Sequence, residues 1–203
     1  RVLSAFADDP AQSLAAVDIL TPEERARVIG EWNVTDADYP REACIHQLFE
    51  AQVAKTPEAV AVVFEDEQLT YAELNRKANQ LAHTLRDHGV GVGDTIGLLL
   101  ERSLEMVIGT LAVLKAGAAY LPIDCEYPEE RQRYLLTESK IRLILVNGAA
   151  PVSLPGLTAL DVTDPVGWSN KTSNLNFAIV PDAALYVMYT SGSTGTPKGV
   201  IAT

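Results

Sequence analysis

From about residue 36 onward, short apolar or β-branched runs alternate with amphipathic segments of roughly 11 to 18 residues. The apolar runs predict strands over 59–64, 94–100, 118–123, 142–146 and 184–189, with short strands at 68–70 and 157–160. Helices are predicted over 45–54, 71–88, 104–115 and 128–139. Because the run 94–100 is apolar throughout, it is typical of a strand that is buried on both faces. The sequence therefore predicts an α/β fold with an open, mostly parallel sheet and helices on both faces.

Capping residues mark where several of these helices begin. Thr70 is followed three residues later by Glu73, and together they predict a capping box at the start of the 71–88 helix. Ser103 is placed to cap the helix over 104–115, which is apolar nearly all round and is therefore predicted to be buried.

Residues 1–35 differ from the rest because they contain no strand-like run. One helix is well marked there, with Thr21 as its cap, Pro22 at its first position and Glu24 closing a capping box. We therefore expect residues 1–35 to form a connector and residues 36–203 to form a domain. The first residues show neither a Met start nor a signal peptide, so we expect a segment of a longer chain.

Composition excludes several classes of protein. The formal net charge is −11, and no basic stripe is present, so we expect no nucleic-acid partner. No apolar run is long enough to span a bilayer, so no membrane partner is expected. Cys44 and Cys125 make no disulfide framework, which favours a reducing, cytoplasmic location. Cys44 and His46 have no second ligand pair near them, so no metal site is predicted.

The segment 189–200 reads YTSGSTGTPKGV and directly follows a predicted buried strand. Glycines allow backbone amides to approach a ligand, hydroxyl groups add donors, and Lys198 adds a fixed positive charge. Such a loop suits a polyphosphate at the carboxyl end of a strand, where open α/β sheets place ligands. The spacing differs from that of P-loop NTPases, because Pro197 precedes the lysine and Gly199 follows it. A flexible Ser/Gly linker is the plainer alternative.

This segment resembles the phosphate-binding signature of the adenylate-forming superfamily. Two more segments, LTYAEL at 69–74 and LKAGAAYLPID at 114–124, resemble core motifs of nonribosomal peptide synthetase adenylation domains. Residues 1–35, with LTPEER and EWN, resemble the linker that follows a condensation domain. Cys125 departs from the family pattern, which commonly has proline there. The resemblance implies the amino-terminal part of the large subdomain of an adenylate-forming enzyme.

In that family, ATP with Mg²⁺ and an amino acid give an aminoacyl-adenylate, and the aminoacyl group then passes to a phosphopantetheine thiol. The resemblance implies that a set of loop residues holds the β- and γ-phosphates and that Lys198 supplies catalytic charge. The set is Thr190, Ser191, Gly192, Ser193, Thr194, Gly195 and Lys198. The implied partners are a condensation domain upstream, and the remaining adenylation domain and a carrier domain downstream.

Other interpretations remain open at this point. The chain stops a few residues past the loop, so the 203-residue piece is expected to be inactive alone and could act as a structural or docking module. An acyl-CoA-ligase-like enzyme is a further alternative, which the linker motifs and the LKAGAAYLPID form disfavour. The amino-acid pocket would lie beyond Thr203, so the sequence does not identify the amino acid.

Overall fold

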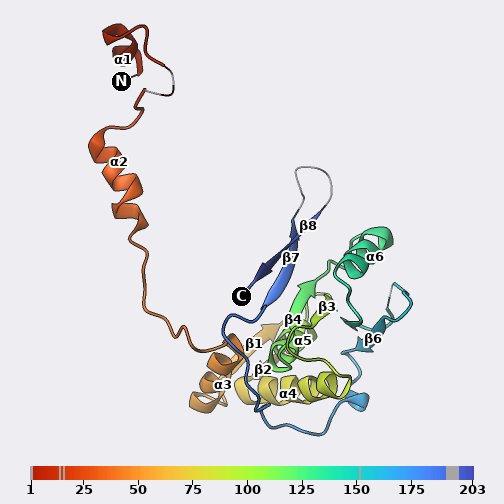
Figure 1. The fold of residues 1–203 in the computed structure, drawn as a ribbon. Coiled ribbons are helices and arrows are strands. Elements are labelled where there is room, and N and C mark those ends of the chain that lie inside the picture. Colours follow the sequence, from red (N-terminus) through yellow and green to blue (C-terminus); the bar gives the residue numbers. More distant parts are fainter. Residues whose placement is uncertain (1, 14, 16, 151, 191–196) are drawn as a thin grey trace. The chain divides into compact units, whose positions relative to one another are not determined.

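The chain divides into two units, Arg1–Pro40 and Arg41–Thr203 (Figure 1). The computed structural model describes residues 2–13, 15, 17–150, 152–190 and 197–203. Every helix within these ranges is too short or too polar to cross a bilayer.

Three helical elements of the first unit have bounds that lie wholly within the described residues. These are α1 (Val2–Asp8), α2 (Pro22–Ile29) and the 3-10 turn η2 (Glu31–Asn33). The predicted capping box at Thr21 and Glu24 is confirmed, with the Thr21 side chain accepting from the Glu24 amide at 3.0 Å. Helix α1 was not predicted. No described residue of these elements is buried, so local caps and backbone hydrogen bonds hold them.

The second unit is built on a six-stranded sheet in the order β6-β5-β3-β4-β7-β8, accompanied by a separate β1-β2 hairpin. Its helices are α3 (Ile45–Lys55), α4 (Tyr71–Asp87), α5 (Leu104–Lys115), α6 (Glu129–Glu138) and the 3-10 turn η3 (Pro165–Gly167). Its strands are β1 (Val60–Phe64), β2 (Glu67–Thr70), β3 (Thr95–Leu99), β4 (Ala119–Pro122), β5 (Leu143–Val146), β6 (Thr158–Asp161), β7 (Tyr186–Thr190) and β8 (Lys198–Ala202). All neighbours in the large sheet pair in parallel except β7 and β8, which are antiparallel.

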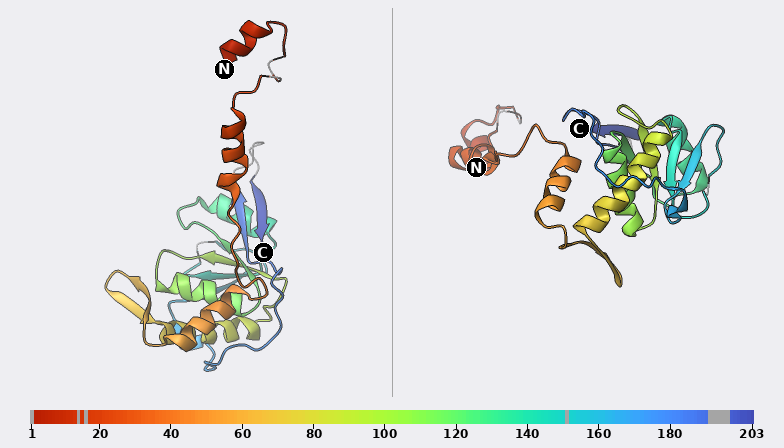
Figure 2. Two further views of the ribbon diagram at one scale, coloured as in Figure 1. Left: turned by 90° about the vertical axis from the view of Figure 1, so that its left-hand side faces the viewer. Right: turned by 90° about the horizontal axis from the view of Figure 1, so that it is seen from below.

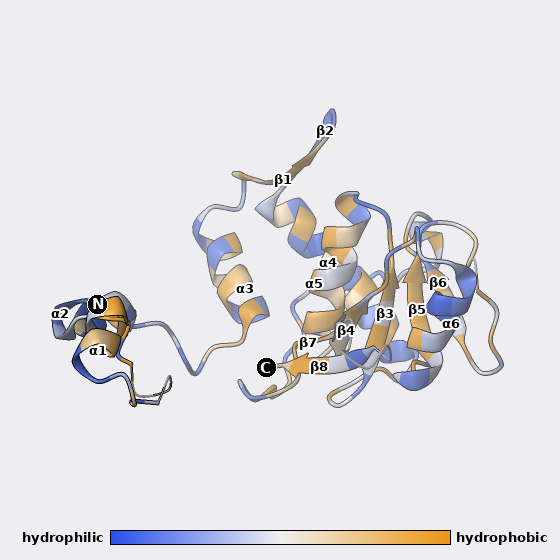
Figure 3. Cartoon of the chain, turned by 90° about the horizontal axis from the view of Figure 1, so that it is seen from above, coloured by the Kyte–Doolittle hydropathy of each residue, from blue (hydrophilic) through white to orange (hydrophobic). Residues whose placement is uncertain are grey.

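Side-chain alternation in the central strands creates two cores. Ile96 and Leu98 of β3 belong to the core under α4 and α5, whereas the next residue, Leu99, belongs to the core under α6. Strand β5 alternates in the same way, and it is hydrophobic along its length in Figure 3. A strand with helices on both sides needs apolar side chains on both faces. The predicted parallel sheet with helices on both faces is therefore confirmed (Figures 1 and 2).

The predicted N-caps of α4 and α5 are confirmed. Thr70 and Glu73 form their capping box, and the Ser103 hydroxyl accepts from the Met106 amide at 3.2 Å. Helix α5 has the bounds that were predicted. In α3, Ile45 and Leu48 are exposed, and His46 is the buried residue.

The end of the chain differs from the prediction. The sequence motif places residues 198–200 in the phosphate loop, but they begin strand β8, which pairs with β7. Lysine and glycine are poor strand formers, so the first two residues of β8 gave no indication of a strand, although Val200 and Ile201 favour one. The loop therefore closes a hairpin between two antiparallel strands.

Candidate functional site

The predicted phosphate loop joins β7 to β8. Thr190, the last residue of β7, and Lys198, the first residue of β8, are partners across the strand pair. The Thr190 hydroxyl donates to the Lys198 carbonyl oxygen at 3.5 Å, and both residues are exposed. The other predicted site residues, Ser191, Gly192, Ser193, Thr194 and Gly195, lie outside the described residues.

Strand direction brings these two ends to the side of the sheet where the parallel strands end. Strand β7 runs parallel to β4, with Tyr186 opposite Tyr120, so Thr190 lies at the carboxyl end of β7. Because β8 runs back antiparallel, Lys198 returns to the same end. Ligands of open α/β sheets bind at the carboxyl ends of strands. The hairpin therefore presents an ammonium group and a hydroxyl group where a polyphosphate would be expected.

Carboxylate and amide side chains also lie at or just after the ends of β4, β5 and β6, but they accept hydrogen bonds from backbone amides in the turns there. Asp161 accepts from the amides of Gly148 at 2.9 Å and Thr163 at 2.8 Å, and these hydrogen bonds lower the pKa of the carboxyl group. Asn147 accepts from the Glu101 amide at 2.8 Å, and Asp124 caps its own turn. Within the described ranges, no three His, Cys, Asp or Glu side chains form a group that could hold a metal ion.

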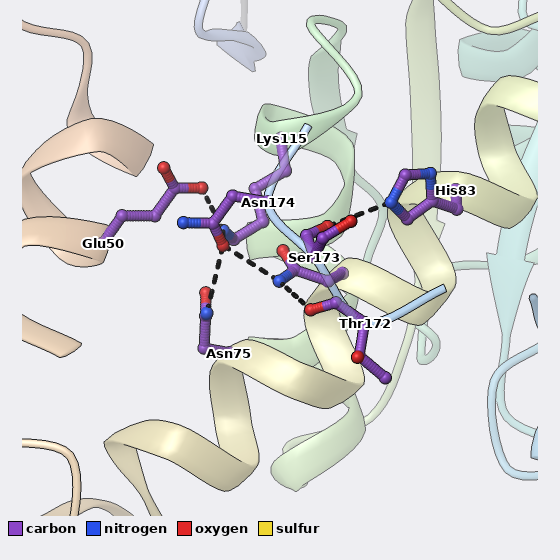
Figure 4. Close-up of polar contacts among 8 residues, drawn as sticks. Glu50, Asn75, His83, Lys115, Thr172, Ser173 and Asn174 are labelled. Carbon is purple, nitrogen blue, oxygen red and sulfur yellow. Dashed lines mark hydrogen bonds and ion pairs between the residues drawn. The ribbon is translucent and has the colours of Figure 1, made fainter. Parts of the chain in front are cut away.

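A second polar group lies between α3, α4, α5 and the segment 172–174 (Figure 4). We call it the Asn174 cluster, and its side chains are Glu50, Asn75, Asn79, Lys115 and Asn174. The Asn174 side-chain oxygen accepts from the Asn75 and Asn79 amides at 3.1 and 2.9 Å and from the Lys115 ammonium at 3.4 Å. The Asn174 oxygen thereby joins α4 and α5 to the distant segment, and α3 is joined to them through the ion pair of Glu50 with Lys115.

Hydrogen bonds to the backbone extend the cluster along α4. The Asn79 amide also donates to the Thr172 carbonyl oxygen at 2.7 Å. His83 Nε2 lies 3.0 Å from the Ser173 carbonyl oxygen, and the Ser169 amide donates to the Thr84 hydroxyl at 2.8 Å. These contacts satisfy the Asn79 amide nitrogen and the Thr84 hydroxyl group and fix the course of residues 169–174, whereas the side-chain oxygens of Asn75 and Asn79 are buried without a hydrogen-bond partner.

Lys115 is the unusual member, because its side chain is 0% exposed. It forms an ion pair with Glu50 and lies 5.8 Å from the centroid of the Phe49 ring. Burial lowers the pKa of Lys115, while the hydrogen bond and charge of Glu50 raise it. Burial also lowers the pKa of the adjacent His46. The lysine was predicted only as the end of a buried apolar helix, and its charge partner was missed.

The two cysteines are free, in line with the expected lack of a disulfide framework. Cys44 is the N-cap of α3 and forms a capping box with Gln47. Burial raises the pKa of both thiols. Cys44 therefore has a structural role as the N-cap of α3.

Comparison with known proteins identifies the class to which this fold and loop belong. Residues 49–203 match the family described as AMP-binding enzyme. The chain belongs to the AMP-binding enzyme family.

Two relatives are named as synthases. The chain is 48% identical over 202 residues to a subunit of mycosubtilin synthase from Bacillus subtilis, and 43% identical over 202 residues to gramicidin S synthase 2 of Brevibacillus brevis. Each alignment covers 99% of this chain, but only 8% and 4%, respectively, of the relatives. The chain thus spans a small part of these proteins.

Solved structures agree with this assignment. The nonribosomal peptide synthetase FmoA3 in its alpha-methyl-L-serine-AMP bound form has a TM-score of 0.80 at 34% identity, covering 92% of this chain and 20% of that one. The N-terminal subdomain of Klebsiella oxytoca NpsA has a TM-score of 0.72 at 26% identity, covering 80% and 42%. The predicted resemblance to the amino-terminal part of an adenylation domain is confirmed.

Proposed function

We propose that this chain is the amino-terminal part of a domain that activates an amino acid with ATP in a nonribosomal peptide synthetase. The observation that carries the proposal is the pairing of Thr190 with Lys198 at the carboxyl end of β7. It brings a positive charge and a hydroxyl group to the site that the motif YTSGSTGTPKG predicts for phosphates. The nonribosomal peptide synthetase FmoA3 has been solved in an alpha-methyl-L-serine-AMP bound form and in an AMPPNP bound form, and these ligands support the same reaction.

In the proposed reaction, an amino-acid carboxylate oxygen forms a bond to the α-phosphorus of MgATP. The bond from that phosphorus to the bridging oxygen breaks, and pyrophosphate leaves with the electron pair. Negative charge therefore grows on the leaving group, where fixed donors lower the barrier most. Lys198 supplies an ammonium group there, and residues 190–195 supply hydroxyl and amide donors.

The division of the chain into two units fits a connector followed by a catalytic domain. We propose that residues 1–35 link a condensation domain to the adenylation domain, and that the remaining adenylation domain and a carrier domain follow. The carrier domain would receive the aminoacyl group on its phosphopantetheine thiol. Magnesium enters with ATP as part of the substrate. The free cysteines fit a cytoplasmic location.

The test is amino-acid-dependent exchange of pyrophosphate into ATP by the full adenylation domain, using a pool of the twenty amino acids. Lys198→Ala is expected to lower the exchange rate about a hundredfold, because it removes a charge from the leaving group. Lys55→Ala, at the exposed end of α3, is the matched control and is expected to exchange like the wild type. Near-normal exchange by Lys198→Ala would refute the role of this lysine.

The 203-residue chain should be assayed beside the full domain. We expect no exchange from it, because the amino-acid pocket is assigned to later residues. Exchange above background would show that those residues are not required.

A further inference from the structure

The aromatic ring of Tyr189 lies across the hairpin that bears the proposed phosphate site. Tyr189 precedes Thr190 on β7, and its partner on β8 is Gly199, the residue after Lys198. A methyl group built on Gly199 would lie 3.2 Å from Cζ and 3.4 Å from Cε2 of the Tyr189 ring. An aromatic ring placed over a cross-strand glycine shields the backbone and strengthens the strand pair. Gly199 thus provides space for the ring.

The hydroxyl group of the same tyrosine reaches another element. It lies 2.9 Å from the Ser139 hydroxyl, within hydrogen-bond distance. Ser139 is the C-cap of α6, and its own amide donates to the Leu135 carbonyl oxygen at 3.1 Å. Leu135 and Leu136 are buried in the core on that side of the sheet, so Ser139 is attached to a well-packed helix.

This contact is made at the end of the hairpin where other support is weak. Strand β7 pairs with β4 at Tyr186, its first residue, whereas the loop begins after Thr190, its last. On the other strand, Val200 and Ile201 are exposed. In Figure 1, β7 and β8 extend away from the other strands. The ring and hydroxyl of Tyr189 therefore join the loop end of the hairpin to the packed body of the unit.

We propose that Tyr189 is a positioning residue for the phosphate site. Its ring holds Gly199, and hence Lys198, against β7, while its hydrogen bond to Ser139 fixes the pair relative to α6 and the sheet. The role rests on the proposed function, because the position of Lys198 matters only if it meets a polyphosphate. Tyr189 itself makes no contact with substrate in this assignment.

The test compares Tyr189→Phe, Ser139→Ala and the double variant in the full adenylation domain. Each single change removes one end of the same hydrogen bond and keeps the ring. We expect each to lower kcat/KM for ATP about fivefold in the exchange assay, the effect of one ordinary hydrogen bond. The double variant is expected to match the single ones, because the three remove one shared interaction. Tyr186→Phe is the matched control, since its ring packs on Tyr120 at the far end of the strand.

Hydrogen exchange at the amides of 198–202 gives a readout that does not depend on activity. Tyr189→Phe is expected to speed exchange there, while the melting temperature stays close to that of the wild type. Additive kinetic effects, or variants that lower the melting temperature without changing kcat/KM for ATP, would overturn the proposal. Unchanged exchange at β8 would refute the tether itself. A wild-type domain that activates no amino acid would instead refute the proposed function, and with it any catalytic consequence of the tether.

Discussion

Two lysines of the second unit, Arg41–Thr203, have opposite surroundings. Lys115 in the Asn174 cluster is buried, is paired with Glu50 and donates to Asn174. Lys198 in the β7–β8 hairpin is exposed at the carboxyl end of the sheet. A buried charge must be matched within the protein, whereas an exposed one can meet a ligand. A lysine thus stabilises the fold at one position and is available to bind a ligand at the other.

The difference extends to the segments around them. The Asn174 cluster joins three helices and a segment about 60 to 100 residues away through buried hydrogen bonds. The hairpin is held by its own strand pairing, by the pairing of β7 with β4 at Tyr186, by the packing of Val187 and by the contacts of Tyr189. Substitutions in the cluster should therefore change stability, and substitutions in the hairpin should change activity.

The largest effect on stability is expected from Lys115→Ala. It leaves Glu50 and the Asn174 oxygen without their charged partner, and breaking a buried pair in this way costs about 3–5 kcal/mol. The free energy of unfolding of the 203-residue chain, measured with urea, checks this value. Arg142→Ala is the control, because it removes an exposed ion pair with Asp94 and should cost about 0–1 kcal/mol. Equal losses in the two variants would contradict the structural role of Lys115.

A smaller effect is expected from the pH dependence of stability. Burial lowers the pKa of His46 in the folded state, with Glu50 opposing this shift and Lys115 adding to it. The unfolded chain therefore binds the proton more readily, and stability is full above the ordinary histidine pKa of about 6.5 and falls below it. The free energy of unfolding should decrease between pH 7 and pH 5.

His46→Gln should make that decrease shallower, because the group that titrates is removed. His88→Gln, at the exposed C-cap of α4, is the comparison variant. If both variants keep the slope of the wild type, His46 does not set it.

The smallest effect on stability is expected from Lys198→Ala. An exposed side chain on an edge strand should change the free energy of unfolding by no more than about 0.5 kcal/mol. The same urea experiment measures it. A loss comparable to that of Lys115→Ala would remove the distinction between the two lysines.

Local patterns predicted much of the fold. The bounds of α5 and the capping boxes of α2 and α4 follow from apolar spacing and from single Thr or Ser residues, which act on the next few amides. Strand β8 was missed because its first residues, Lys198 and Gly199, belong to the loop motif and are poor strand formers, and only their pairing with β7 makes them part of a strand.

The candidate site was predicted unevenly for the same reason. The chemistry of Lys198 could be inferred from the adjacent glycines and hydroxyl groups. The Asn174 cluster could not, because Asn79 and Asn174 are 95 residues apart and meet only after folding. One indication was present, since Asn75 and Asn79 stand four positions apart beside the apolar face of α4. The contact between Tyr189 and Ser139, which are 50 residues apart, had no local indication at all.

The large sequence separation between the members of the Asn174 cluster has a consequence for the folding of this protein during its synthesis. Synthesis proceeds from the amino terminus, so α4 and α5 leave the ribosome well before residues 172–174. Until those residues emerge, Asn75 and Asn79 lack the acceptor that they use in the finished fold. The nascent α4–α5 pair must keep these amides in contact with water, and α4 can close over its polar side only when the later segment arrives.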